Sequence, residues 1–319
     1  MKLAFLFPGQ GSQAVGMGRA LAQRFPPARE VFETADRVLG YPLSTICWEG
    51  PEDELTKTSN AQPALLTTSV AALRMVTAAG LSPAAVAGHS LGEYSACVAA
   101  GALEFEDALR LTRRRGELMQ RAGVERPGTM AAFLGLSRAE VDEVCRAAAE
   151  AGVVQAANLN APGQVVVSGE VAAVERACEL AKARGAKRAI RLDVSGAFHS
   201  PLMASATTGL VQALRATTFR DTRCPVVSNV AAEPATRGPA IREALECQLL
   251  GAVRWEDSMR RMRESGIEGF VEIGAGRVLR GLLRTIDREI PAWNVEDPDS
   301  LAATLGALQA PQPATGGTS

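Results

Sequence analysis

Histidine is scarce in this chain: its 319 residues include two, His89 and His199, so any histidine chemistry is confined to two positions. Charge of either sign is not in excess. The net charge is −1 at pH 7, which gives no reason to expect binding to nucleic acid or to a membrane surface. The sequence has no apolar run long enough to span a membrane, and its first apolar run is too short for a signal peptide.

Closely spaced cysteines are also absent. Six cysteines are scattered with no Cys-x-x-Cys pair, at positions 47, 97, 145, 178, 224 and 247. This pattern is typical of free thiols in a reducing compartment and argues against a disulfide framework or a zinc site. We therefore expect a cytoplasmic protein without a bound metal. Apolar residues make up 47% of the chain and charged residues 22%, which is ordinary for a globular enzyme.

A Gly-x-Ser-x-Gly motif, in which Ser90 lies between Gly88 and Gly92, is the most informative stretch that is present. We expect a short apolar strand over residues 84–87 and an alanine-rich helix over residues 93–100. A serine on such a strand-to-helix turn takes a strained conformation, and the glycines are needed where neighbouring backbone leaves no room for a Cβ atom. The free N–H groups at the start of the helix point towards the serine. The motif predicts that Ser90 is a nucleophile whose reaction builds an oxyanion.

A serine nucleophile needs a base within hydrogen-bond reach. His89 directly precedes Ser90, and adjacent side chains on a turn generally point apart, which disfavours it. His199 lies in a loop of small residues ahead of a helix and is the better candidate. The third group that orients the imidazole stays open, because Asp193 and a backbone or amide carbonyl are equally good candidates.

Three further polar residues have apolar or glycine-rich surroundings. The backbone N–H of Gln10, in the loop after the first strand, is a candidate oxyanion donor together with the N–H of Leu91. Arg115 carries the planar fork that grips a carboxylate, although one arginine in a run of three more often belongs to a solvated helix face. Gln62, next to Pro63, fits the start of a helix.

The order of the expected elements predicts an α/β fold. Short apolar strands alternate with helices over residues 1–126 and 196–308, which predicts one discontinuous α/β-hydrolase-like domain with a short parallel sheet. Residues 127–195 read strand-helix-strand-strand-helix-strand, the order of a small ferredoxin-like (βαββαβ) domain inserted in the large one. The tail, residues 309–319, is rich in Pro, Gly, Thr and Ala, and we expect it to be disordered.

Several short motifs occur together in one order along the chain. They are Phe7-Pro8-Gly9-Gln10-Gly11-Ser12-Gln13, Asn60-Ala61-Gln62-Pro63-Ala64, Gly88-His89-Ser90-Leu91-Gly92-Glu93-Tyr94-Ser95, Arg115-Gly116, Asn158-Leu159-Asn160-Ala161-Pro162-Gly163-Gln164, Ala197-Phe198-His199-Ser200 and Glu272-Ile273-Gly274-Ala275-Gly276. Over residues 2 to about 305, the chain resembles the malonyl-CoA:acyl carrier protein transacylases, which load malonyl groups for fatty acid synthesis. The combined set is highly specific for the acyltransferase family.

The resemblance implies a malonyl transferase that works through a malonyl-Ser90 ester. His199 would act first as general base and then as acid for the leaving CoA thiol. Arg115 would bind the free malonyl carboxylate, and the N–H groups of Gln10 and Leu91 would form the oxyanion hole. The thiol of the phosphopantetheine arm of acyl carrier protein would then take the malonyl group.

The resemblance also implies roles for residues around these. The main-chain carbonyl of Gln248 would orient the catalytic histidine, which would leave Asp193 structural. Gln62 would line the acyl pocket, and Asn158 would contact the substrate. Phe198 and Leu91 match the pattern of relatives that select malonate, because a bulky ring leaves no room for an α-methyl branch.

The resemblance also implies the substrates and partners of the protein. Malonyl-CoA and acyl carrier protein are expected as substrates, with no cofactor, no nucleic acid, no membrane and a monomeric enzyme. A basic cluster is a candidate surface for the acidic carrier, with a solvated charged face as the alternative: Lys182, Arg184, Lys187, Arg188 and Arg191. Rival functions are a serine hydrolase, an idle scaffold protein and an acyltransferase that serves a polyketide synthase.

Overall fold

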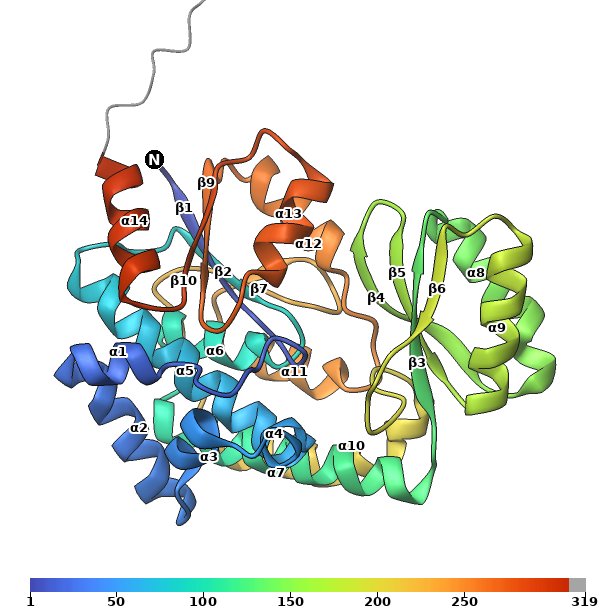
Figure 1. Cartoon of the computed structure of the whole chain (residues 1–319), viewed down its shortest axis with the longest axis horizontal. Coiled ribbons are helices and arrows are strands. Elements are labelled where there is room, and N and C mark those ends of the chain that lie inside the picture. The colour runs from blue at the N-terminus through green and yellow to red at the C-terminus, as the bar shows by residue number, and fades with distance from the viewer. Residues whose placement is uncertain (310–319) are drawn as a thin grey trace, which may run out of the picture.

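A six-stranded sheet forms the centre of the larger part of the molecule (Figure 1). The protein is described here by a computed structural model covering residues 1–309. The strands of this sheet are β1 (Leu3–Phe7), β2 (Ala85–Gly88), β7 (Val226–Val227), β8 (Pro234–Ala235), β9 (Gly269–Ile273) and β10 (Ala292–Val295). They lie in the order β10-β9-β1-β2-β7-β8, and all neighbours are parallel except β7 and β8.

Both faces of this sheet are covered, which is why its central strands are apolar throughout. Along β1, Leu3, Phe5 and Phe7 join one hydrophobic core, while Ala4 and Leu6 join the other. The larger core is completed by α1 (Arg19–Arg24), α2 (Pro26–Leu39), α3 (Leu43–Glu49), α4 (Glu52–Thr56), α5 (Thr58–Ala78), α6 (Gly92–Ala100), α7 (Phe105–Glu125), α10 (Ala204–Ala216), α11 (Gly238–Gln248) and α14 (Pro298–Gln309). The smaller core is completed by α12 (Trp255–Glu264) and α13 (Val278–Ile286).

A second, antiparallel sheet lies to one side of the larger part (Figure 1, green to yellow). It contains β3 (Thr129–Leu134), β4 (Val154–Ala161), β5 (Gln164–Gly169) and β6 (Arg188–Arg191) in the order β4-β5-β3-β6. The helices α8 (Arg138–Ala148) and α9 (Val171–Ala183) pack on it over a core of their own. Ser137 and Glu140 form a capping box at the start of α8.

The expected helix start at Gln62 is wrong. The helix α5 begins at Thr58, so Pro63 lies inside it. Proline has no N–H with which to bond the carbonyl four residues earlier. That carbonyl, of Ser59, instead accepts a hydrogen bond from Arg113 Nη1 at 3.1 Å, so it keeps a donor despite the proline.

The C-terminal prediction is altered by one residue. Gln309, which was placed in the disordered tail, is the last residue of α14, and the rest of that tail lies outside the described residues. Within residues 1–309, no helix combines the length and the apolar character needed to cross a membrane.

Candidate active site

Ser90 occupies a sharp turn between β2 and α6, at the carboxyl end of the parallel sheet. Its backbone φ is 51°, in the left-handed region that residues with a side chain rarely adopt. A Cβ atom on Gly88 would lie 1.9 Å from the carbonyl oxygen of Gly92, and one on Gly92 would lie 2.1 Å from that of Phe7. The glycines are therefore required by close backbone approach, as the motif predicted.

His199 is hydrogen-bonded to this serine. Its Nε2 atom lies 2.8 Å from Ser90 Oγ, and its Nδ1 atom lies 3.0 Å from the carbonyl oxygens of both Gln248 and Gly251. A carbonyl oxygen can only accept, so Nδ1 carries the proton and Nε2 is free to accept one from the serine. The geometry is that of a nucleophile and its base.

Neither rival side chain takes part in this pair. His89 turns away, with Nε2 at 2.8 Å from Asn160 Oδ1 and its ring against Trp255. Asp193 is exposed, and the carbonyl partners of His199 Nδ1 come from Gln248, the last residue of α11, and from Gly251 just after it. A main-chain carbonyl, rather than a carboxylate, therefore orients the imidazole, and Gly251 is a second such group that the sequence did not point out.

Burial keeps both imidazoles neutral. Burial and the nearby Arg115 cation lower the pKa of His199 to about 3, and burial lowers that of His89. A lowered pKa means that the neutral form persists below the usual titration range of histidine. His199 is thus able to accept a proton from Ser90 at neutral pH.

We expect His199 not to titrate between pH 8 and about pH 5.5, a window that includes the ordinary imidazole pKa of about 6.5, and the pKa of His89 to lie below that ordinary value. Long-range proton–nitrogen NMR spectra would measure this, because the chain has two imidazoles and a His199→Gln variant assigns them. A titration midpoint near 6.5 for the ring of His199 would contradict the buried, neutral base.

Arg115 is buried beside the nucleophile rather than on a solvated helix face. Its side chain is 1% exposed, and its guanidinium donates to Gln62 Oε1 and Gln248 Oε1 at 2.9 Å and to Ser90 Oγ at 3.2 Å. Among residues 1–309, no carboxylate forms an ion pair with it. A buried cation without a bonded anion is costly, which makes it a strong site for an anionic ligand.

A cleft of about 620 Å³ opens over these residues. Leu91, Phe198, Asn158 and Gln10 line it together with Ser90, His199 and Arg115. Among the described residues, the backbone N–H groups of Gln10 and Leu91 have no intramolecular acceptor. Two unpaired N–H donors in a cleft with a nucleophile are suited to an oxyanion.

Gln62 is fully buried behind two residues of the cleft lining. Its Oε1 accepts from Arg115 Nη1 at 2.9 Å, and its Nε2 lies 3.2 Å from Met119 Sδ. That Gln62 lines the acyl pocket stays a prediction.

The small sheet is joined directly to the histidine. Two backbone hydrogen bonds join strand β4 to Val253. The N–H of Leu159 donates to the Val253 carbonyl oxygen, and the N–H of Val253 donates to the Ala157 carbonyl oxygen, both at 2.8 Å. Gln155 Nε2 donates to the carbonyl oxygen of His199 at 2.9 Å. One wall of the cleft is therefore fixed against the segment that orients the base.

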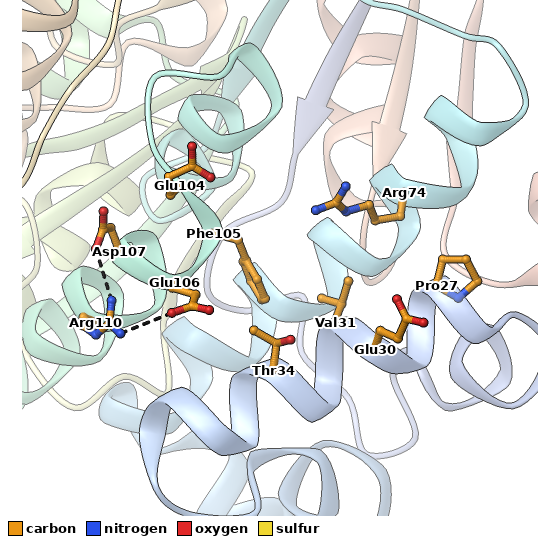
Figure 2. Close-up of a pocket in the computed structure, with 10 residues that line it drawn as sticks. All are labelled: Pro27, Glu30, Val31, Thr34, Arg74, Glu104, Phe105, Glu106, Asp107 and Arg110. Atoms are coloured by element: carbon orange, nitrogen blue, oxygen red, sulfur yellow. Dashed lines mark hydrogen bonds and ion pairs between the residues drawn. The ribbon is translucent and has the colours of Figure 1, made fainter.

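A second cavity of about 600 Å³ lies between α2, α5 and the start of α7 (Figure 2). Its lining is charged, but Arg110 pairs with Glu106 and Asp107 of its own helix, and Glu104 pairs with Arg220. The lining includes no serine, cysteine or histidine. It offers no chemistry comparable with that of the Ser90 cleft.

Two buried residues at the site were missed from the sequence. Asn229 and Glu93 are each 1% exposed and bond to the backbone and side chains around Ser90. Asn229 follows β7, the neighbour of β2, so a polar residue at the carboxyl end of an adjacent parallel strand was the available signal.

Comparison with known sequences assigns this arrangement to a family. Residues 4–312 match the acyl transferase domain family. The malonyl CoA-acyl carrier protein transacylase of Bacillus subtilis is 48% identical over 97% of this chain and 98% of its own length. The protein of the same name from Escherichia coli is 46% identical over 95% of this chain and 99% of its own length.

Solved structures agree. The malonyl CoA-acyl carrier protein transacylase of Coxiella burnetii superposes with a TM-score of 0.94 at 40% identity, over 97% of this chain and 98% of that one. A malonyl-transacylase solved in complex with a type II PKS acyl-carrier protein superposes with a TM-score of 0.93 at 44% identity, over 96% of this chain and 100% of that one. The chain therefore belongs to the acyl transferase family, and within it to the malonyl CoA-acyl carrier protein transacylases.

Proposed function

We propose that this chain transfers the malonyl group of malonyl-CoA to the phosphopantetheine thiol of acyl carrier protein. The observation that carries the proposal is the buried guanidinium of Arg115, 3.2 Å from the hydroxyl of Ser90. An acyl group that ends in a carboxylate satisfies this cation while its thioester carbon lies at the nucleophile. The names of the relatives, which act as malonyl CoA-acyl carrier protein transacylases, support the same substrate pair.

In the first half-reaction, Ser90 Oγ bonds to the thioester carbon while its proton passes to His199 Nε2. The carbonyl oxygen becomes an oxyanion that the N–H groups of Gln10 and Leu91 stabilise. When the C–S bond breaks, the CoA sulfur takes the proton from His199 and leaves as the thiol. The carbonyls of Gln248 and Gly251 hold the imidazole in the tautomer that this exchange requires.

In the second half-reaction, the carrier thiol gives its proton to His199 and its sulfur attacks the malonyl-Ser90 ester. The same oxyanion donors act again, and Ser90 Oγ recovers its proton from the imidazolium as the ester bond breaks. The reaction consumes no redox equivalent and needs no cofactor or metal. Malonyl-CoA and the carrier are both substrates.

The remaining cleft residues are assigned to substrate selection. Phe198 and Leu91 line the space beside the acyl group, and a ring there disfavours an α-methyl branch by roughly 1–3 kcal/mol, the usual cost of one misplaced methylene. Asn158 lines the same cleft and is assigned to substrate contact. Gln62 fixes one end of the Arg115 guanidinium.

We assign two domains to this function. The first, residues 1–126 and 196–308, is α/β-hydrolase-like and carries Ser90, His199 and Arg115. The second, residues 127–195, is ferredoxin-like, an assignment supported by its β-α-β-β-α-β order and antiparallel strand arrangement. A cytoplasmic, monomeric enzyme completes the proposal, and the six free cysteines of the described chain are consistent with a reducing compartment.

The experiment that tests the function is a two-step transfer followed by intact-mass spectrometry. The protein is mixed with malonyl-CoA, separated from it, and then mixed with holo acyl carrier protein. We expect one malonyl group first on the protein and then on the carrier. Rapid release of free malonate without an adduct would indicate a hydrolase instead, and neither product would indicate an idle scaffold. A panel of fatty acid and polyketide carriers would decide which carrier is served.

The carrier is expected to dock beside β6. There Lys187 and Arg188 are exposed, and no ion pair involves them within the described chain, whereas Arg184 pairs with Glu143 and Arg191 with Glu175. Replacing Lys187 and Arg188 with Glu should raise KM for the carrier several-fold and leave KM for malonyl-CoA unchanged, because like charges repel the acidic carrier.

A matched control reverses two equally exposed arginines, Arg19 and Arg24 on α1, which lies away from the small sheet (Figure 1). Steady-state kinetics with both substrates measure the effect. If KM for the carrier is unchanged in the Lys187/Arg188 variant, or rises equally in the control, the docking prediction is wrong and these residues form an ordinary solvated face.

A further inference from the structure

Both peptide groups of Ser90 are held by side-chain amides from distant parts of the chain. The N–H of Ser90 donates to Asn229 Oδ1 at 2.7 Å, and its carbonyl oxygen accepts from Gln248 Nε2 at 2.8 Å. Backbone in the left-handed region persists only where its surroundings over-determine it. The Ser90 carbonyl also accepts from the Glu93 N–H at 3.1 Å, so the Asn229 amide is the partner of the N–H and the Gln248 amide adds a second donor to the carbonyl.

Asn229 contributes a second bond to the same turn. Its Nδ2 atom donates to the carbonyl oxygen of Gly88 at 2.7 Å, so one amide group links the peptide units before and at the nucleophile. The side chain is 1% exposed, and both the oxygen and the nitrogen of its amide bond to the backbone of the turn. Because both bonds need the turn in this geometry, the buried amide stabilises this one backbone conformation.

Glu93 fixes the two amide-bearing residues relative to each other. Its carboxylate accepts from the backbone N–H of Asn229, with both oxygens at 3.3–3.4 Å, and from Gln248 Nε2 at 2.6 Å. Glu93 is itself 1% exposed and lies on the first turn of α6, directly after the elbow. The elbow, Asn229 and Gln248 thus form one hydrogen-bonded unit.

We propose that Asn229 is a positioning residue for the nucleophile, holding the Ser90 backbone so that Oγ meets His199 Nε2, with Glu93 locking Asn229 and Gln248 in place. The inference rests on the proposed role of Ser90. A different φ at residue 90 would swing the hydroxyl away from the 2.8 Å contact with the base. Asn229 touches neither Arg115 nor the cleft, so it acts on the reaction rate rather than on substrate binding.

The test compares Asn229→Ala, Asn229→Asp and a control, Asn294→Ala. Asn294 is also buried and also uses both ends of its amide, towards Arg280 and Glu296, but it lies on β10. Two rates are measured for each folded protein: malonyl-enzyme formation from malonyl-CoA, and labelling of Ser90 by a fluorophosphonate. The second reports nucleophile reactivity without the proposed substrate.

In Asn229→Ala, both rate constants should fall by about 100-fold, the scale expected for a displaced reacting group, while the malonyl-CoA concentration at half-maximal rate changes less than about threefold. The control should stay near wild type. Wild-type rates in Asn229→Ala, at equal folded fraction by circular dichroism, would overturn the proposal.

Asn229→Asp separates positioning from simple loss of stability. As a carboxylate it repels the Gly88 carbonyl, but as a neutral acid it supplies one acceptor for the Ser90 N–H and one O–H donor for Gly88. The rates of Asn229→Asp relative to wild type should therefore rise towards one as the pH falls from 8 to 5, a range in which Glu93, whose pKa burial raises to about 7, titrates in both proteins. A ratio that stays low at pH 5 would overturn the proposal even if Asn229→Ala fails to fold. If wild type reacts with the fluorophosphonate but not with malonyl-CoA, the proposed function fails while the ratios still decide the role of Asn229.

Discussion

Replacing Ser90 with alanine is expected to abolish the malonyl adduct and to lower transfer to the carrier by about 10⁴-fold or more, the scale seen when a serine nucleophile is removed. The reason is that Ser90 Oγ is the group in the cleft that is both hydrogen-bonded to a neutral imidazole and approached by a cation, at 2.8 Å and 3.2 Å. Loss of one hydroxyl leaves the fold intact, because the strained backbone is held by other groups.

Intact-mass spectrometry after incubation with malonyl-CoA measures this result directly. Ser12→Ala is the matched control, since Ser12 also lines the cleft but has no part in the proposed chemistry. Wild type and the control should each carry one malonyl group, and Ser90→Ala none. An adduct that persists in Ser90→Ala would mean that another residue is the nucleophile.

Replacing Arg115 with methionine is expected to remove the preference for malonyl-CoA. Hydrogen bonds to charged groups contribute about 1.5–3 kcal/mol each, so losing a bidentate pair should lower kcat/KM for malonyl-CoA by about 10²–10⁴-fold. Acetyl-CoA has no carboxylate, and its kcat/KM should change little. Lysine in place of arginine should recover only part of the loss, because an ammonium cannot make two parallel bonds.

The control for this experiment is Arg114→Met, the adjacent residue on α7, whose side chain is exposed. It should leave both substrates unaffected. Arg115 also bonds Gln62 and Gln248, so thermal midpoints are recorded to show that the variant is folded. Equal losses with malonyl-CoA and acetyl-CoA would mean that Arg115 supports the fold and does not recognise the carboxylate.

The turn that carries the proposed nucleophile was predictable because its signal is local. A strand, two glycines and a helix within a few residues are enough to define the turn around Ser90, and the close contacts at Gly88 and Gly92 arise within that turn and with the neighbouring strand β1. His199 was accessible by elimination in a chain with two histidines. The alternation of strands and helices was visible for the same reason, since periodicity is a property of short segments.

The role of Arg115 was not predictable from spacing. Residues 113–115 are three consecutive arginines on one helix, and successive helical positions point in different directions. One is exposed, one bonds Tyr41 and Asn60, and only Arg115 turns towards Ser90. The family resemblance identified it, while the spacing alone favoured a solvated face.

By itself, the sequence determined the α/β class, the elbow and the choice of Ser90 as the proposed nucleophile, because each depends on residues that are close along the chain. Only the tertiary structure decided what surrounds that nucleophile. The base is 109 residues away from Ser90, Asn229 is 139 residues away, and Gln248 is 158 residues away. Asn229 reaches the elbow because it follows β7, the parallel neighbour of β2, whereas His199 comes from a loop and Gln248 from the end of α11, so no local pattern of the sequence brings the three together.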